Sequence, residues 1–232
     1  MHLQQPNRSP TAAQPVAARG ALLAVAALVL AACSGVAASS DGGSLPAARR
    51  AWAAEWHAVW QIEWSSAPVE GPLVVEVWHR GAGGLRLETL EAPTVALAGL
   101  TLVDDGEQVW LVDLRSNRVE HGLSQAVRIP LASDALDVWI WLLADAEQAT
   151  LHWRQADVLE SGPATKLALT TGAGDQATVW IDDQTGLPAG LDLSSHLWGH
   201  VTMVTRSISP AGPLSPALFA FHPPAGAEII DR

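Results

Sequence analysis

The sequence predicts an α+β fold, in which a meandering antiparallel sheet is covered by a few helices. Two observations predict it. Short segments of alternating apolar and polar residues recur along most of the 232-residue chain, with turns rich in Gly, Asp and Asn between them. In their midst, residues 133–145 have apolar side chains at helical spacing, and a further helical segment precedes the first strand. A chain of this length can bury one core, so one domain is expected.

The N-terminal residues have the order of a secretory signal peptide. Arg8 and Arg19 precede an apolar stretch at 21–30, and no acidic residue lies before Cys33. The stretch is too short to span a bilayer, which needs about 20 apolar residues. Leu-Ala-Ala directly before Cys33 resembles the bacterial lipobox, in which the cysteine thiol is acylated and the cysteine becomes the new N-terminus. The alternative is an ordinary signal peptide with an incidental cysteine.

Acylation of Cys33 would hold an extracytoplasmic domain on a bacterial membrane, in the cell envelope, through its lipid. The expected organisation is a signal peptide at 1–32, the acylated cysteine with a flexible Gly- and Ser-rich tether at 33–45, and a folded domain at 46–232. Because Cys33 is the only cysteine, no intramolecular disulfide can form. The fold must therefore be stabilised by its core alone.

The charge of the chain limits its partners. There are 24 Asp and Glu against 13 Lys and Arg, a net charge of −11, and loss of residues 1–32 would remove two arginines. An acidic domain repels phosphate backbones and anionic headgroups, so nucleic-acid binding is not expected. Contact with the membrane is expected through the lipid anchor and not through a basic surface.

The first helix is predicted from Pro46 to about His57, since proline suits a first helical turn and the segment is rich in alanine. From Ala58 to Ser65 apolar and polar residues alternate, which predicts a strand. The boundary between helix and strand stays open, because four tryptophans also fit one long helical stripe: Trp52, Trp56, Trp60 and Trp64.

Ten further strands are expected, each short and bounded by turn residues. They are expected at 73–80, 85–90, 100–103, 108–114, 118–121, 150–159, 164–171, 176–182, 187–193 and 200–208. The helix at 133–145 interrupts this series. Its apolar stripe is expected to lie across the sheet as a lid, and consists of Leu136, Trp139, Ile140 and Leu143.

Three motifs resemble one family. Residues 179–188 read VWIDDQTGLP, residues 105–111 read DGEQVWL, and residues 219–230 read FAFHPPAGAEII, an F-x-F strand followed by an apolar ending. Each is similar to a segment of the LolA/LolB-like bacterial lipoprotein carriers, a group that includes lipid-binding lipoproteins of mycobacteria and periplasmic sensors of the same fold. The resemblance covers about residues 46–230, and the order of elements also matches.

The resemblance implies an incomplete antiparallel barrel, a curved sheet closed by helices around an apolar cavity. It implies no catalytic residue and no specific ligand residue. The anchored members of the group carry a lipobox, which residues 30–33 of this chain resemble. Two functions follow: a carrier of lipid or of lipoprotein acyl chains, or a sensor of the same fold that acts on a membrane protein partner.

Alternation along the strands assigns ten apolar side chains to the concave face of the sheet, as candidates to line a ligand cavity. They are Trp60, Ile62, Val75, Val77, Leu85, Leu87, Leu167, Leu169, Val179 and Ile181. If side chains fill the interior it is a core, and otherwise it is a pocket of about 300–1,000 Å³. The 11 Trp, with 2 Phe and no Tyr, could serve either purpose.

Enzymatic signatures are weak, so the chain is expected not to be an enzyme and to hold no cofactor or metal. The sequence contains no G-x-S-x-G, H-E-x-x-H or P-loop motif, and acylation would remove the only thiol. His196 and His200 are four residues apart, but on a strand this spacing separates them by about 13 Å. A buried carboxylate or histidine with a shifted pKa in the cavity would favour an enzyme after all.

Overall fold

The computed structural model describes residues 43–65, 70–123 and 125–232, and Asp41–Arg232 form one compact unit. The predicted signal peptide, Cys33 and the tether up to residue 42 lie outside the described residues. Within the described part of the chain, no helix combines the length and the apolar character that a membrane span requires.

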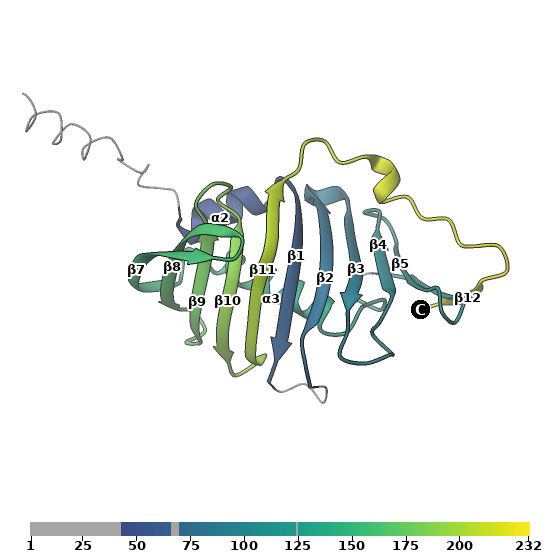
Figure 1. The fold of residues 1–232 in the computed structure, drawn as a ribbon, viewed down its shortest axis with the longest axis horizontal. Coiled ribbons are helices and arrows are strands. Elements are labelled where there is room, and N and C mark those ends of the chain that lie inside the picture. Colours follow the sequence, from purple (N-terminus) through teal and green to yellow (C-terminus); the bar gives the residue numbers. More distant parts are fainter. Residues whose placement is uncertain (1–42, 66–69, 124) are drawn as a thin grey trace, which may run out of the picture. The chain divides into compact units, whose positions relative to one another are not determined.

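The described strands form one curved, twelve-stranded sheet that does not close (Figure 1). All neighbouring strands are antiparallel except β12, which runs parallel to β6. The sheet order is β12-β6-β5-β4-β3-β2-β1-β11-β10-β9-β8-β7. The strands are β1 Glu55–Trp64, β2 Leu73–Arg80, β3 Leu85–Glu91, β4 Leu100–Asp104, β5 Val109–Asp113, β6 Arg118–Gly122, β7 Thr150–Leu159, β8 Gly162–Thr170, β9 Gln176–Asp182, β10 Pro188–Ser195, β11 Gly199–Pro210 and β12 Glu228–Asp231. This is the predicted α+β fold with an incomplete antiparallel barrel.

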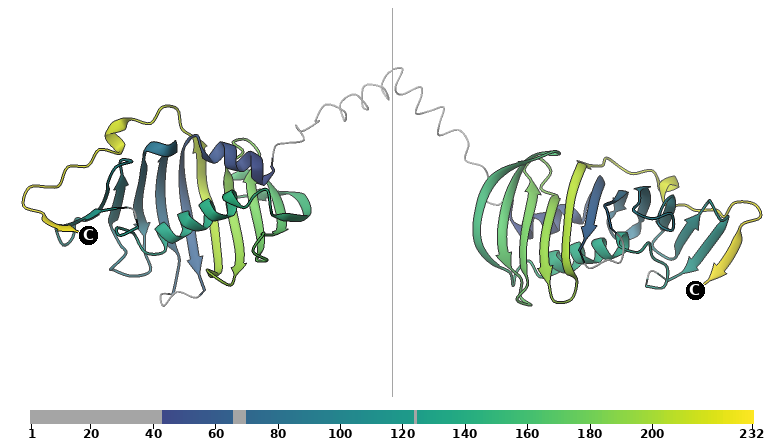
Figure 2. Two further views of the ribbon diagram at one scale, coloured as in Figure 1. Left: turned by 180° about the vertical axis from the view of Figure 1, so that it is seen from behind. Right: turned by 60° about the horizontal axis from the view of Figure 1, so that its bottom comes forward.

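Two α-helices lie against the sheet. α2 (Leu45–Trp52) begins after Ser44, whose hydroxyl oxygen accepts a hydrogen bond of 3.3 Å from the backbone N–H of Ala47. α3 (Ala132–Ala144) crosses one face of the sheet, as seen from behind in Figure 2. The predicted arrangement of an N-terminal helix and an inserted helix over the sheet is thus confirmed.

The predicted end of the first helix is wrong. α2 ends at Trp52 and β1 begins at Glu55, so that Trp56 belongs to the strand. In β1, buried and less buried residues alternate from Glu55 to Ile62, and the strand pairs with β2 and β11. Pairing on both sides and burial of Trp56 outweigh the helical preference of the alanines before it.

The predicted strand at Phe219–Phe221 is also wrong. A short 3₁₀ turn, η2 (Pro216–Leu218), precedes Phe219, and only Glu228–Asp231 joins the sheet. The chain between β11 and β12 runs as a strap along the end of the sheet (Figure 1). Phe219 is buried and packs under the Arg80 guanidinium, 4.6 Å from its ring centroid, so this phenylalanine fixes the strap.

The interior is filled mainly by indole rings and aliphatic side chains. Trp56, Trp60 and Trp139 are each 1% exposed. The ring of Trp52 lies 4.6 Å from that of Trp56, 6.0 Å from that of Trp60 and 6.2 Å from that of Trp139, between centroids. Since Trp52 comes from α2 and Trp139 from α3, the cluster joins both helices to the sheet.

Candidate functional site

The ten side chains assigned to the concave face share one interior. Nine of them belong to one buried cluster, and Leu85 packs against that cluster. The alternation therefore located the interior of the half-barrel. Most of these side chains pack against one another as core, and their role in contacting a ligand stays a prediction.

A cavity of about 670 Å³ lies at one end of this interior, among β2 to β5, α2, the chain before α3 and the first half of α3. Of the ten residues, only Leu85 lines it. Its apolar walls also include Trp52, Leu102, Val109, Val127, Leu136 and Ile140. The volume falls within the range typical of sites for small ligands.

The four residues of the predicted lid separate into two pairs. Leu136 and Ile140 line the cavity, whereas Trp139 and Leu143 are buried in the core. Ile140 is 50% exposed, and the role of these four residues as a lid stays a prediction. Leu136 and Ile140, one turn apart on α3, thus face the cavity, while Trp139 and Leu143 pack in the core.

The start of α3 is held by polar contacts of two residues whose types suit a helix start, Asp134 and Ser133. Asp134 accepts a hydrogen bond of 3.1 Å from the backbone N–H of Leu131. The hydroxyl oxygen of Ser133 accepts a hydrogen bond of 3.1 Å from the backbone N–H of Ile129. Carboxylates near a helix N-terminus are favoured by the helix dipole, so Asp134 stabilises the turn that forms one wall of the cavity.

Arg128 is the charged residue that links the chain before α3 to the helix. Its Nη2 donates to Asp134 Oδ1 at 2.8 Å and to Asp137 Oδ2 at 2.7 Å. Burial alone would lower the pKa of Arg128, but the hydrogen bonds and charges of Asp137 and Asp134 outweigh it and raise the pKa. Arg128 and Asp137 both line the cavity.

His79 lines the same cavity from the end of β2. Its ring is stacked on Trp56 with centroids 5.0 Å apart, and its Nδ1 lies 3.1 Å from the carbonyl oxygen of Ala54. Burial lowers the pKa of His79, and the hydrogen bond to Ala54 opposes this only in part. His79 is therefore neutral at pH 7. Extending the alternation of Leu73, Val75 and Val77 by one step would have found it.

A glycine loop, η1 (Gly81–Gly83) with Gly84, forms another part of the wall. A Cβ atom on Gly84 would lie 2.8 Å from the ring of Phe219. Only glycine therefore fits between the cavity and the C-terminal strap. The strap supports the wall from behind.

The two histidines with the spacing of metal ligands do not converge on one point. His196 Nδ1 lies 2.8 Å from Asp175 Oδ1, and His200 Nδ1 lies 3.7 Å from Asp192 Oδ1. No group of three metal-ligating side chains occurs among the residues whose placement is described. Asp175 is buried and also accepts a hydrogen bond of 3.0 Å from the Ser195 hydroxyl, so it ties together two neighbouring turns.

No protein-family model matches this chain, and no curated protein matches it. Solved structures do. An uncharacterized conserved protein from Thermus thermophilus matches at 15% identity and a TM-score of 0.52, over 81% of this chain and 96% of that one. MucB matches at 15% identity and a TM-score of 0.50, over 80% of this chain and 62% of MucB, less than two thirds of that protein.

A LolA superfamily protein from Nitrosomonas europaea is also among the matches, at 10% identity and a TM-score of 0.36, over 76% of this chain and 96% of that one. At such identities a likeness between structures extends to the fold alone. The matches to the Thermus thermophilus protein and to MucB therefore show that this chain shares their fold, and they assign it no role.

Proposed function

We propose that the domain binds the apolar part of a lipid or of a lipoprotein acyl chain in the cavity between α3 and the sheet, and acts as a carrier. The observation that supports this is the cavity of about 670 Å³, whose lining combines apolar side chains such as Leu85, Leu102 and Val127 with polar and charged ones. Each methylene group moved from water into such a site contributes about 0.8 kcal/mol, so an acyl chain is a suitable ligand.

We place the domain outside the cytoplasm, anchored in the cell envelope through acylated Cys33. The sequence supports this through the lipobox-like residues before Cys33 and the Gly- and Ser-rich tether after it. The domain boundaries proposed above, 1–32, 33–45 and 46–232, belong to the same proposal. The tether would let the cavity reach ligands at a distance from the membrane.

We assign no catalysis to the cavity. His79 is a buried histidine with a lowered pKa, which by itself would favour an enzyme. However, the Nδ1 atom of its ring lies within hydrogen-bond distance of backbone groups, the carbonyl oxygen of Ala54 or the N–H of Gly81, of which it can pair with one at a time, and the ring of Trp56 stacks on it. Within the described residues, no hydrogen bond joins the His79 ring to a carboxylate or to a hydroxyl group that it could activate.

The carrier proposal is tested by partly filling the cavity. Ile140→Trp places a larger side chain at the cavity, and Leu151→Trp makes a comparable change on β7, where Leu151 is 55% exposed. Both variants add one indole, so their fluorescence backgrounds match. An apolar dansyl probe should bind the wild type and Leu151→Trp alike, and Ile140→Trp at least about fivefold more weakly. Equal binding to both variants would contradict the proposed site.

A second function, a sensor that contacts a membrane protein, is favoured by a different observation. The interior is largely filled, and β7 ends the sheet with apolar side chains exposed: Leu151, Trp153 and Val158. Exposed apolar residues on an edge strand are suited to a partner. A photo-crosslinker at position 153, compared with one at Glu160 in the turn after β7, should capture one defined membrane protein if this function holds.

A further inference from the structure

The charges around the cavity are unbalanced. Asp104, Arg128 and Asp137 line it, and Arg128 already donates to both Asp134 and Asp137. One guanidinium is thus shared by two carboxylates. Because the single positive charge of Arg128 faces two carboxylates, one negative charge stays uncompensated on this side of the cavity.

Asp104 adds a second negative charge from the opposite wall, at the end of β4. Its Oδ1 accepts a hydrogen bond of 2.8 Å from the backbone N–H of Gly106, and no ion pair to Asp104 is found within the described residues. Asp105 and Glu107 follow in the same exposed turn. The rim near β4 is therefore acidic.

The other candidate cation close to the wall is directed elsewhere. The guanidinium of Arg80 stacks on Phe219, and its Nη2 donates to the carbonyl oxygen of Gly83 at 2.5 Å. Arg80 does not line the cavity, and the neighbouring His79 is neutral at pH 7 because burial lowers its pKa. A negative group entering the cavity would find no unpaired positive charge among its described lining residues.

We propose that the cavity selects amphiphiles whose apolar body ends in a positively charged headgroup such as an ammonium, and that it disfavours anionic amphiphiles. The apolar body would contact Leu85, Leu102 and Val127, and the headgroup would lie near the carboxylates of Asp104 and Asp137. The two carboxylates would attract a cationic headgroup and repel an anionic one, and this difference gives the specificity. The inference rests on the proposed apolar-ligand function and specifies its ligand class.

Two matched probes test the inference. Both consist of a dansyl group on an eleven-carbon chain, and one ends in a primary ammonium while the other ends in a carboxylate. An exposed charge contact changes affinity by up to about fivefold, with opposite sign for the two probes, so fluorescence titration of the full domain at low salt should give up to about 25-fold tighter binding of the ammonium probe. Raising the salt concentration should reduce the ratio.

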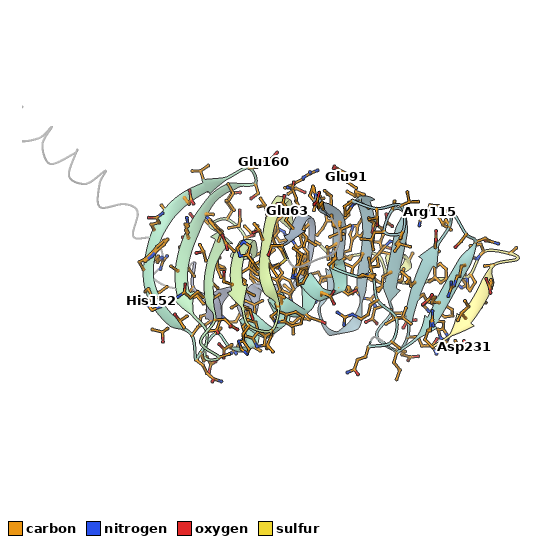
Figure 3. All side chains as sticks on the ribbon, turned by 90° about the horizontal axis from the view of Figure 1, so that it is seen from below. Glu63, Glu91, Arg115, His152, Glu160 and Asp231 are labelled. Atoms are coloured by element: carbon orange, nitrogen blue, oxygen red, sulfur yellow. The ribbon has the colours of Figure 1, made fainter. Side chains whose placement is uncertain are left out.

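The double variant Asp104→Asn/Asp137→Asn leaves Arg128 paired with Asp134 alone, so the charges at and beside the cavity cancel. The ratio of the two affinities should fall to within about twofold. The control Glu63→Gln/Glu160→Gln removes the same net charge from two residues that do not line the cavity, and its ratio should equal that of the wild type. Both residues are labelled in Figure 3.

The possible outcomes separate the two proposals. If both probes bind and Ile140→Trp weakens both, but their affinities are equal or the anionic probe binds more tightly, the apolar site stands and the charge selection is refuted. If the ratio is unchanged in Asp104→Asn/Asp137→Asn, or falls equally in the control, the assignment to these carboxylates is refuted. If neither probe binds the wild type, both proposals fail.

Discussion

Replacing Trp139 by alanine tests whether α3 has one face in the core and another face at the cavity. Trp139 is 1% exposed and its ring contacts the tryptophan cluster, whereas the adjacent Ile140 is half exposed and lines the cavity. Removing a buried indole costs about 3–5 kcal/mol, partly because a void remains. For a domain of this size, about 1 kcal/mol corresponds to 2–4 °C in Tm, so Tm should fall by roughly 6–20 °C.

Ile140→Ala is the matched variant. The side chain of Ile140 already faces the solvent and the cavity, so we expect the variant to lose about 1 kcal/mol or less in the free energy of unfolding. Affinity for an apolar dansyl probe should nevertheless fall, because apolar area that contacts the ligand is lost. Trp139→Ala is expected to change stability more than it changes binding. Ile140→Ala is expected to change binding more than it changes stability.

The assay is urea denaturation at 25 °C followed by far-UV circular dichroism, since the loss of an indole would alter a fluorescence signal. Probe binding is measured on the same preparations below the start of unfolding. If Trp139→Ala loses less than about 1.5 kcal/mol, Trp139 is not a core residue and the cluster contributes little. If Ile140→Ala is the more damaging of the two to stability, the division of α3 into two faces is wrong.

Three further predictions concern titration and the anchor. Burial lowers the pKa of His79, so below about pH 6.5 the unfolded chain binds a proton that the folded chain does not. Stability should therefore fall as the pH decreases through this value. His79→Gln should remove this part of the dependence of the urea midpoint on pH. Burial tends to raise the pKa of Asp175, but hydrogen bonds from His196 and Ser195 outweigh it and lower the pKa. Its stabilisation is thus present above about pH 4 and lost as pH falls through the lowered pKa, and Asp175→Ala should cost about 2–3 kcal/mol at pH 7 in urea denaturation. Cys33→Ser should abolish incorporation of labelled palmitate and release the domain from membranes, and equal labelling of the variant would contradict acylation.

Much of the sheet could be predicted because its signal is local. The strands at 73–80, 150–159 and 176–182 have the predicted bounds, since each shows alternation and ends at turn residues. The end of α2 could not be predicted, because the tryptophans fit both a helix and a strand and the choice depends on pairing with distant strands. The strap was mistaken for a strand because Phe219 and Phe221 alternate, although no described strand pairs with them.

The cavity was harder to predict than the core. Alternation indicates which side chains point inward, but it cannot indicate where large side chains leave space. Three tryptophans fill the centre, and the space lies at one end, where β2 to β5 meet the chain before α3. Arg128 lies in a segment without periodicity, and Asp137 lies beside the apolar stripe of α3, so neither gave a signal as a site residue.

The pairing of β1 with β11 has a consequence for when this chain can fold. The two strands lie side by side in the sheet, joining positions as distant in sequence as Trp56 and Pro210. Neither half of the sheet is connected to the other until β11 has been synthesised, and contacts of such long sequence separation slow folding. A nascent chain therefore stays open until nearly all of it has left the ribosome. If the chain is exported before it folds, as proposed above, late closure is an advantage. Truncation before Gly199, which removes β11, should prevent closure altogether.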